Sequence, residues 1–291
     1  MRNQIIQGDA LAILRQLPDA IAQCCVTSPP YWGLRDYGVA EQIGLEQSPE
    51  EFITRLVEVF HEVRRVLRPD GVLWVNIGDS YAEKKTAAEL PPKNLLLMPA
   101  RLALALQADG WIVRADCIWA RTNAMPEPVR DRPAKSHEYV FLLARSEHYF
   151  YNVEATRQPL KEKTRSTWGN KVSTRGGDSL GKVKSDNWAK TTYERKPRLN
   201  ADGSIAGAHL RSVWNIAGAR FKGAHLATFP PKLIEPCIMA GSRPGDLILD
   251  PFLGSGTTAM VAQSLGRDYL GIELNPAYIA LAEQRIAEKR K

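Results

Sequence analysis

The sequence predicts an α/β protein whose sheet is mostly parallel and doubly wound. Strand-like and helix-like runs alternate over residues 1–150, and they alternate again from residue 231 to residue 291. A strand, a glycine-rich turn and a helix follow one another at 246–266. Strands that alternate with helices along a chain pair in parallel, with helices on both faces of the sheet. A chain of 291 residues is long enough for one such domain with a substantial insertion.

The clearest single element is a helix over residues 48–67. Ser48 is a suitable N-cap, Pro49 occupies the first helical position, and the apolar residues that follow recur with the helical period. Further helices are predicted at 9–17, 94–110, 231–242 and 259–266, with a terminal helix from Pro276. Strands are predicted at 3–9, 22–28, 72–79, 111–120, 138–146, 246–250 and 268–274.

The net charge of +7 is concentrated in one block. Residues 155–224 hold 15 Lys or Arg against 5 Asp or Glu, whereas the rest of the chain holds 24 basic and 27 acidic residues. The block has no sustained periodicity, and its aromatic residues include Trp168, Trp188, Tyr193 and Trp214. Basic residues interleaved with aromatics fit a polyanion with stacking bases; a solvated basic face is the alternative. We expect one domain formed by residues 1–154 and 221–291, with an inserted recognition segment at 155–220.

The cysteines and the hydropathy of the sequence indicate in which compartment the protein functions and whether it binds a metal. Cys24, Cys25, Cys117 and Cys237 lie in apolar runs without C-x-x-C or His/Cys spacing, which predicts buried thiols, a reducing compartment and no metal site. The N-terminus lacks a continuous apolar segment, and no apolar run approaches the roughly 18 residues of a membrane span. The chain is therefore expected to be cytoplasmic, with no membrane contact.

The stretch TSPPYW at 27–32 leaves a predicted strand in an unusual way. Two prolines end the strand, because they fix φ and donate no N–H, and two aromatic residues follow at once. One interpretation is a rigid turn with Tyr31 and Trp32 in the core. The other is a rigid cup for a flat, aromatic substrate.

The glycine-rich stretch DPFLGSGTT at 250–258 predicts a nucleotide-like ligand. Gly254 and Gly256 allow close backbone approach at a helix N-terminus, and Glu273 follows Asp250 by 23 residues, the spacing of an acid that binds ribose. The alternative is a tight turn with a surface glutamate. Neither a P-loop nor the full dinucleotide pattern G-x-G-x-x-G is present, so an adenosine ligand without pyrophosphate, such as S-adenosylmethionine, fits best.

Taken in this order, the two motifs resemble those of amino-group DNA methyltransferases of the β arrangement, the cytosine-N4/adenine-N6 family. The catalytic motif of that family, [DNS]-P-P-[YFW], corresponds to Ser28-Pro29-Pro30-Tyr31, and F-x-G-x-G corresponds to the stretch from Phe252. The segment HLATFPPKLIEP and the early Gly8-Asp9 also match, so the resemblance covers about 220 residues, 1–150 and 221–291. It implies a Rossmann-like, circularly permuted fold with an added antiparallel strand, S-adenosylmethionine as cofactor, and 155–220 as the target-recognition insert.

The resemblance also implies the roles of individual residues. The catalytic set is Ser28, Pro29, Pro30 and Tyr31. The cofactor-binding set is Asp9 at the adenine end, Glu273 at the ribose, Phe229 closing the pocket, and Asp250, Phe252, Gly254, Ser255, Gly256, Thr257, Thr258 and Asn275. DNA contacts are expected from Arg130, Arg132, Lys135, Lys171, Arg175, Lys182 and Lys184, the first three of which are otherwise ordinary loop charges.

The chemistry expected of the catalytic motif is localisation of an amine lone pair. The Ser28 hydroxyl and the Pro29 carbonyl each accept an N–H of the exocyclic amine, while Tyr31 stacks on a base extruded from double-stranded DNA. Serine in the first position favours cytosine N4 by family correlation alone, since aspartate there is typical of adenine-N6 enzymes. Adenine N6 is the first alternative; an RNA or protein-amide methyltransferase and a binding-only protein follow.

The roles of three polar residues near the motifs, and the binding partners of the chain, each have more than one interpretation. Asn76 and Asp79 end a strand that faces the expected cleft, and Asp79 is as well suited to a helix N-cap as to catalysis. His137 fits a hydrogen-bonded structural role better than that of a general base. A cognate restriction endonuclease is a possible partner, and both a monomer and a homodimer are compatible with the sequence.

Overall fold

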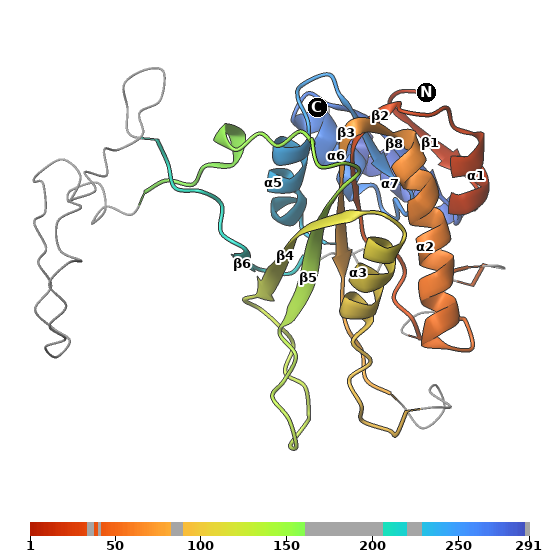
Figure 1. Cartoon of the computed structure of the whole chain (residues 1–291), viewed down its shortest axis with the longest axis vertical. Helices are drawn as coiled ribbons and strands as arrows, with labels where there is room; N and C mark the ends of the chain where they lie inside the picture. The colour runs from red at the N-terminus through yellow and green to blue at the C-terminus, as the bar shows by residue number, and fades with distance from the viewer. Residues whose placement is uncertain (34–37, 40–41, 83–89, 161–205, 220–228, 289–291) are drawn as a thin grey trace, which may run out of the picture. The chain divides into compact units, whose positions relative to one another are not determined.

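The computed structural model describes residues 1–33, 38–39, 42–82, 90–160, 206–219 and 229–288 (Figure 1). The chain divides into two compact units, one formed by Met1–Ala155 with Arg211–Lys291 and the other by Thr156–Leu210. In the described part of the smaller unit, Gln158 and Ala208 form an isolated antiparallel bridge, and the Arg157 guanidinium donates to the Gly207 carbonyl at 2.7 Å. The larger unit contains the sheet and both sequence motifs.

The larger unit is built on an eight-stranded sheet in the order β1-β8-β7-β2-β3-β5-β4-β6. Only β5 runs antiparallel to its neighbours, β3 and β4; all other pairs are parallel. The mostly parallel sheet with one added antiparallel strand is thus confirmed. The strands are β1 (Gln4–Gln7), β2 (Ala22–Thr27), β3 (Leu67–Ile77), β4 (Ile112–Arg121), β5 (His137–Ala144), β6 (Val213–Ile216), β7 (Leu247–Asp250) and β8 (Asp268–Glu273).

Helices cover both faces of this sheet, as a doubly wound fold requires (Figure 1). One face carries α1 (Ala10–Gln16), α2 (Pro49–Val66) and α3 (Met98–Ala108), which pack side by side. The other carries α5 (Pro231–Gly241), α6 (Thr257–Ser264) and α7 (Pro276–Glu288). Among the described helices, none is long and apolar enough to span a membrane.

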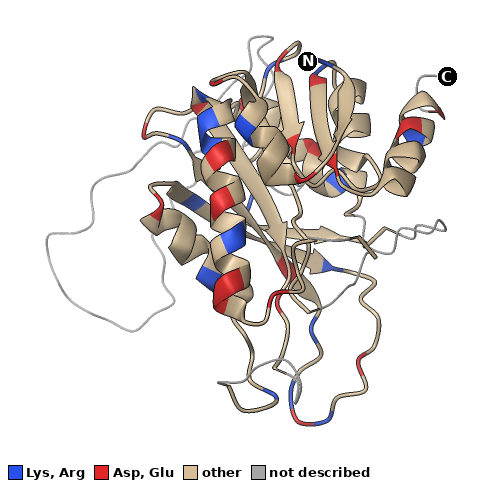
Figure 2. Cartoon of the chain, turned by 90° about the vertical axis from the view of Figure 1, so that its right-hand side faces the viewer, with Lys and Arg blue, Asp and Glu red and all other residues tan. Residues whose placement is uncertain are grey.

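Local sequence signals explain where the helices begin. The Ser48 hydroxyl accepts the Glu51 N–H at 3.2 Å, Pro49 opens the first turn of α2, and residues such as Phe52 and Leu56 are fully buried. Acidic and basic residues alternate along this helix (Figure 2). The helix expected at 48–67 is therefore confirmed. Asp9 caps α1 in the same way, accepting the Ala12 N–H at 2.8 Å.

Three elements differ from the sequence prediction. The strand expected at 72–79 is β3, which already begins at Leu67. The helix expected from residue 94 begins only at Met98, because Leu95 forms a bridge with Tyr81 and Leu97 has a left-handed φ of 55°. Residues 213–216, which we expected inside the insert at 155–220, form β6 and pair in parallel with β4. The packing of Trp214 stabilises this strand: its buried ring lies with its centroid 6.1 Å from that of the Trp74 ring.

The four cysteines are buried and free, as predicted. Cys24 and Cys25 lie within β2, Cys117 within β4 and Cys237 within α5. Burial raises the pKa of the Cys117 thiol to about 11 and those of Cys25 and Cys237 well above their ordinary value. Protonated, enclosed thiols of this kind are core residues and not nucleophiles.

Candidate active site

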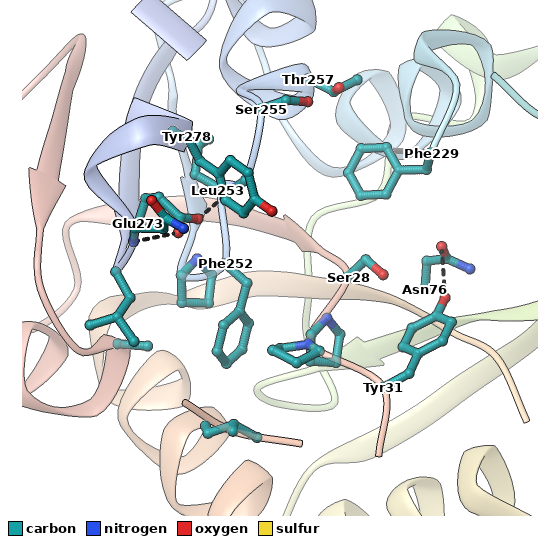
Figure 3. A pocket seen from close by; sticks show the side chains of 18 of the residues that line it. Ser28, Tyr31, Asn76, Phe229, Phe252, Leu253, Ser255, Thr257, Glu273 and Tyr278 are labelled. Atoms are coloured by element: carbon teal, nitrogen blue, oxygen red, sulfur yellow. Dashed lines mark hydrogen bonds between the residues drawn. The ribbon is translucent and has the colours of Figure 1, made fainter. Parts of the chain in front are cut away.

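A cavity of about 460 Å³ opens at the carboxyl ends of β2 and β7, and both sequence motifs line it (Figure 3). These two strands are neighbours in the sheet, but α2 follows β2 on one face and α6 follows β7 on the other. The chain connections therefore diverge between them, which is where open α/β sheets bind ligands. The fold thus brings together two motifs that lie more than 200 residues apart in the sequence.

The glycine turn after β7 forms one wall of the cavity. Gly254, with a left-handed φ of 55°, lines the cavity and donates its N–H to Glu273 at 2.7 Å. Gly256, also left-handed at 79°, does not line it: a Cβ there would lie 2.7 Å from that of Ala282 in α7. Gly256 therefore packs its backbone against Ala282 of α7, and its contact with the cofactor stays a prediction.

Glu273, at the end of β8, projects into the cavity from the neighbouring strand (Figure 3). Its two carboxylate oxygens accept the Gly254 N–H at 2.7 Å and the Asn275 N–H at 2.8 Å. Burial raises the pKa of this carboxyl group, while those backbone hydrogen bonds act in the opposite direction. Because each oxygen has a second lone pair, the carboxylate can still accept hydroxyl groups of a bound sugar.

The remaining predicted cofactor residues divide into two groups. Those that line the cavity are Asp9, Phe229, Phe252, Ser255, Thr257 and Asn275. Asp250 and Thr258 do not line it and are 2% and 1% exposed. Asp250 instead accepts the Thr27 hydroxyl at 2.6 Å and the Phe252 N–H at 3.0 Å, and Thr258 donates to the Val26 carbonyl at 3.2 Å. These two side chains therefore bind β2 and do not line the cavity, and their predicted contribution to the cofactor site is untested.

Ser28, Pro29, Pro30 and Tyr31 line the opposite wall of the cavity (Figure 3). The Tyr31 hydroxyl donates to Glu138 at 2.6 Å, and its ring lies against Gly78, where a Cβ would be 2.8 Å from the ring. Burial and the neighbouring Glu138 raise the Tyr31 pKa well above its ordinary value, so the hydroxyl stays protonated. This tyrosine is held as a neutral, fixed surface.

The second aromatic residue of the motif has a different place. Trp32 is buried in the core, and its indole N–H donates to the Glu46 carbonyl at 2.9 Å. The two interpretations of the TSPPYW stretch thus apply to one aromatic residue each. Tyr31 faces the cavity, whereas Trp32 anchors the loop.

A polar cluster at this end of the cavity was only partly visible in the sequence. Glu138 accepts the Asn76 amide at 3.2 Å and pairs with Arg121 at 3.3 Å, and both partners line the cavity with it. Asn76 was expected at the cleft, but Glu138 and Arg121 were not identified. Arg121 and Glu138 meet because β4 and β5 pair with Ala120 opposite His137, which are the chain neighbours of these two residues. No local sequence signal predicts this register.

Lys135 also lies in this cluster and not on an outward loop. It lines the cavity, its ammonium group donates to the Asp79 carbonyl, and burial lowers its pKa. Asp79 itself accepts the Met98 N–H at 3.0 Å and so satisfies the first amide of α3 from a distant position, whereas the N-cap residue of that helix is Leu97. The ammonium group has two further N–H donors that can bind a ligand in the cavity, and its predicted contact with a DNA phosphate stays a prediction.

The other predicted DNA contacts have mixed positions. Arg130 is exposed, whereas Arg132 pairs with Glu127 at 2.7 Å and covers the Tyr81 ring at 3.9 Å. His137 is exposed and lies edge-on to Tyr139. Lys171, Arg175, Lys182 and Lys184 lie outside the described residues. Contact with DNA remains a prediction for all of these basic residues. Within the described ranges, no group of three or more His, Cys, Asp or Glu side chains is arranged to hold a metal ion.

Comparison with known proteins agrees with this geometry. The chain is 45% identical over 302 aligned residues to the type II methyltransferase M.XycI of Xanthomonas campestris pv. cyanopsidis, covering 97% of this chain and 87% of the relative. It is 44% identical to the type II methyltransferase M.Cfr9I of Citrobacter freundii, with the same two coverages. The structure of TTHA0409 from Thermus thermophilus, solved in complex with S-adenosyl-L-methionine, matches with a TM-score of 0.64 and 24% identity, over 99% of this chain and 94% of that one.

The family model described as DNA methylase, for N6 and N4 methyltransferases, matches residues 22–284, which include both motifs and every element from β2 to most of α7. Since that match and the relatives both span most of the chain, the protein belongs to the DNA methylase family.

Proposed function

We propose that this DNA methylase is a site-specific enzyme that methylates the exocyclic N4 amine of cytosine in double-stranded DNA. The observation that carries the proposal is the shared cavity in which Ser28 and Pro29 face the glycine turn and Glu273. An acceptor pair for an amine and a binding site for an adenosine ligand thus open onto the same space. The order of the motifs, catalytic before cofactor, supports the β arrangement and a circularly permuted fold.

The residues of the glycine-turn wall fit S-adenosylmethionine, which supplies an electrophilic sulfonium methyl group when bound. The Glu273 carboxylate has acceptor capacity for ribose hydroxyls, and Asp9 lies at the neighbouring β1 end of the cavity. Phe252 and Phe229 provide apolar surface for the adenine ring. Gly254 leaves its backbone open to close approach, because it has no side chain and a left-handed conformation.

The opposite wall fits a flipped base. The Ser28 hydroxyl and the Pro29 carbonyl accept the two N–H groups of an exocyclic amine, which localises the nitrogen lone pair. The Tyr31 ring, fixed by Glu138 and Gly78, stacks on the base and sets its plane. Because these acceptors are in place before the substrate arrives, little reorganisation is needed during the reaction.

Two further side chains support cytosine over adenine. Lys135 and Arg121 line the cavity beside Tyr31 and can donate hydrogen bonds to the base. Cytosine presents a carbonyl oxygen at O2 next to the N3 acceptor, whereas adenine presents a C–H at the equivalent edge. Donors at this end of the cavity therefore add to the family correlation for serine at position 28.

The proposal extends to the organisation and partners of the chain. Residues 1–154 and 221–291 form the catalytic part together with β6, and the basic segment between them recognises the target sequence. A cytoplasmic enzyme that methylates one DNA sequence is suited to protect it from a restriction endonuclease of the same specificity. The working unit is a monomer or a homodimer.

Nucleoside analysis tests the proposal directly. The purified protein is incubated with unmethylated DNA and S-adenosylmethionine, the DNA is digested, and the nucleosides are identified by mass spectrometry. We expect N4-methylcytosine. N6-methyladenine would overturn the base assignment and leave the reaction class intact. No methylated nucleoside on DNAs of varied sequence, with methylation of RNA or of a protein amide instead, would overturn the proposal.

A further inference from the structure

The ends of β2 and β7 are joined by a side-chain hydrogen bond outside the cavity. Thr27, the last residue of β2, donates its hydroxyl to Asp250, the last residue of β7, at 2.6 Å. The two side chains are 1% and 2% exposed. The backbone register between these strands pairs Cys24 with Ile248 and Cys25 with Leu249. The hydrogen bond between Thr27 and Asp250 therefore joins the two strands beyond their paired residues.

This bond lies at the base of both loops that form the cavity. Thr27 directly precedes Ser28, and Asp250 directly precedes the glycine turn. The same Asp250 oxygen that binds Thr27 also accepts the Phe252 N–H at 3.0 Å, inside that turn. One carboxylate oxygen therefore holds the start of the catalytic loop and the start of the cofactor loop. The short distance is typical of a hydrogen bond to an ionised acceptor.

A second contact ties the same two segments together. Thr258, in the first turn of α6, donates its hydroxyl to the Val26 carbonyl at 3.2 Å. Thr258 is also fully buried. Val26 and Thr27 of β2 are thus fixed to both ends of the segment 250–258, and the loop between those ends has little freedom to shift relative to Ser28.

The relative position of the two loops has a large effect on the proposed reaction. In-line transfer requires the nucleophile and the electrophilic carbon to lie about 3–3.5 Å apart before reaction, and a displacement of about 1 Å can lower the rate about a hundredfold. In the proposed site the acceptors of the amine are on the β2 loop, and Phe252, Gly254, Ser255 and Thr257 of the cofactor wall are on the β7 loop. A connection between the loops therefore sets the distance between the two reactants.

We propose that Thr27 and Asp250 are positioning residues whose hydrogen bond fixes the catalytic loop against the cofactor loop at the distance that methyl transfer needs. This inference rests on the proposed function for its kinetic consequence, but it applies equally to cytosine N4 and adenine N6. It gives Asp250 a role that does not involve contact with the ligand.

A matched pair of variants tests the inference. Thr27→Val removes the hydroxyl and keeps the branched shape, whereas Thr27→Ser keeps the hydroxyl and removes a methyl group. We expect Thr27→Val to lower kcat about a hundredfold, with unchanged dissociation constants for S-adenosylmethionine and DNA, and Thr27→Ser to retain wild-type kcat. Rates are measured in single turnovers and divided by the number of S-adenosylmethionine-binding sites from calorimetric titration.

A readout independent of activity is amide hydrogen exchange without ligands. The Phe252 amide should exchange faster in Thr27→Val than in Thr27→Ser, because its acceptor is no longer held in place. Equal exchange in the two variants, or a kcat per binding site in Thr27→Val equal to wild type, would overturn the proposal. A loss of activity matched by an equal loss of binding sites indicates unfolding alone, and the double variant described below then decides.

Two provisions keep the result interpretable. If Thr27→Val does not fold, the double variant Thr27→Val/Asp250→Leu removes both partners and leaves no unpaired buried carboxylate, which is better tolerated. The kcat per binding site of the double variant, measured in the same way, then supports or overturns the proposal. If the wild-type protein methylates nothing, the proposed function fails, whereas the exchange comparison of the two Thr27 variants still supports or overturns the connection between the loops.

Discussion

The Tyr31 hydroxyl donates a 2.6 Å hydrogen bond to the Glu138 carboxylate, which joins the loop after β2 to the start of β5. Asn76 and Arg121 bind the same carboxylate, so Glu138 is itself fixed from two further strands. A phenylalanine or tryptophan at position 31 would offer the same stacking surface without this anchor. The orientation of the ring in this protein therefore depends on its hydroxyl.

Tyr31→Phe should lower kcat about tenfold, because a stacking ring that can tilt holds the base less accurately. The affinity for S-adenosylmethionine should not change, since the glycine turn is untouched. Single-turnover methylation and calorimetric titration measure the two quantities. Tyr139→Phe is the matched control, because Tyr139 packs against His137 and Phe141 and does not line the cavity. Equal rates for the two variants would contradict the anchoring role of the hydroxyl.

Lys135→Met distinguishes a base contact from a phosphate contact. If Lys135 donates to the base, the variant should lose about 10–100-fold in kcat/KM, while the salt dependence of DNA binding stays the same. If it contacts a phosphate, DNA affinity should fall and the slope of log K against log salt should decrease by about 1. Fluorescence anisotropy at several salt concentrations measures the slope. Lys93→Met, at an exposed ion pair with Asp131, is the control.

Gly256→Ala should destabilise the fold more than Gly245→Ala. Both glycines are left-handed, with φ of 79° and 82°, so each substitution costs about 1–2 kcal/mol of backbone strain. Only Gly256 has a neighbour in the way, the Ala282 side chain, and we expect about 1–3 kcal/mol more there. Urea denaturation gives the two free energies of unfolding. Similar values would show that α7 moves aside without cost.

The stability of the protein should depend on pH through Asp250. Burial raises the pKa of this carboxyl from its ordinary value of 3.8 to about 6, and the charge of Glu273 adds to the shift. The neighbouring Thr258 and Thr27 hydroxyls and the Phe252 amide act in the opposite direction. A folded-state pKa above the unfolded one contributes stability that is fully present below about pH 4 and is lost as pH rises through about 6.

Asp250→Asn removes this dependence. Its free energy of unfolding relative to wild type should increase by on the order of 3 kcal/mol between pH 4 and pH 7. Thermal or urea denaturation across that range measures the difference, with Asp246→Asn as a control at a carboxylate that is partly exposed. A difference that stays constant with pH would show that Asp250 titrates in the folded protein as it does in the unfolded chain.

The sequence by itself determined the order and type of most elements and indicated the ligands of the two motifs. Ser48, Pro49 and the apolar period predict α2 because caps and periodicity are local properties. The motifs around Ser28 and Gly254 indicate a base amine and an adenosine ligand, because binding each of these ligands requires particular residue types at a particular spacing. Residues 213–216 were not recognised as a strand, since β6 has only four residues, follows a long polar segment and is stabilised by the packing of Trp214.

The tertiary structure decided which side chains reach the cavity. Asp250 and Glu273 both end a strand beside the glycine turn, yet Asp250 turns to Thr27 and only Glu273 faces the ligand space. Glu138 enters the site only through the register of β5 with its neighbours, which places it beside Tyr31. Such contacts join residues about 100 to more than 200 positions apart, so they depend on strand order and pairing, which the local pattern of the sequence does not specify.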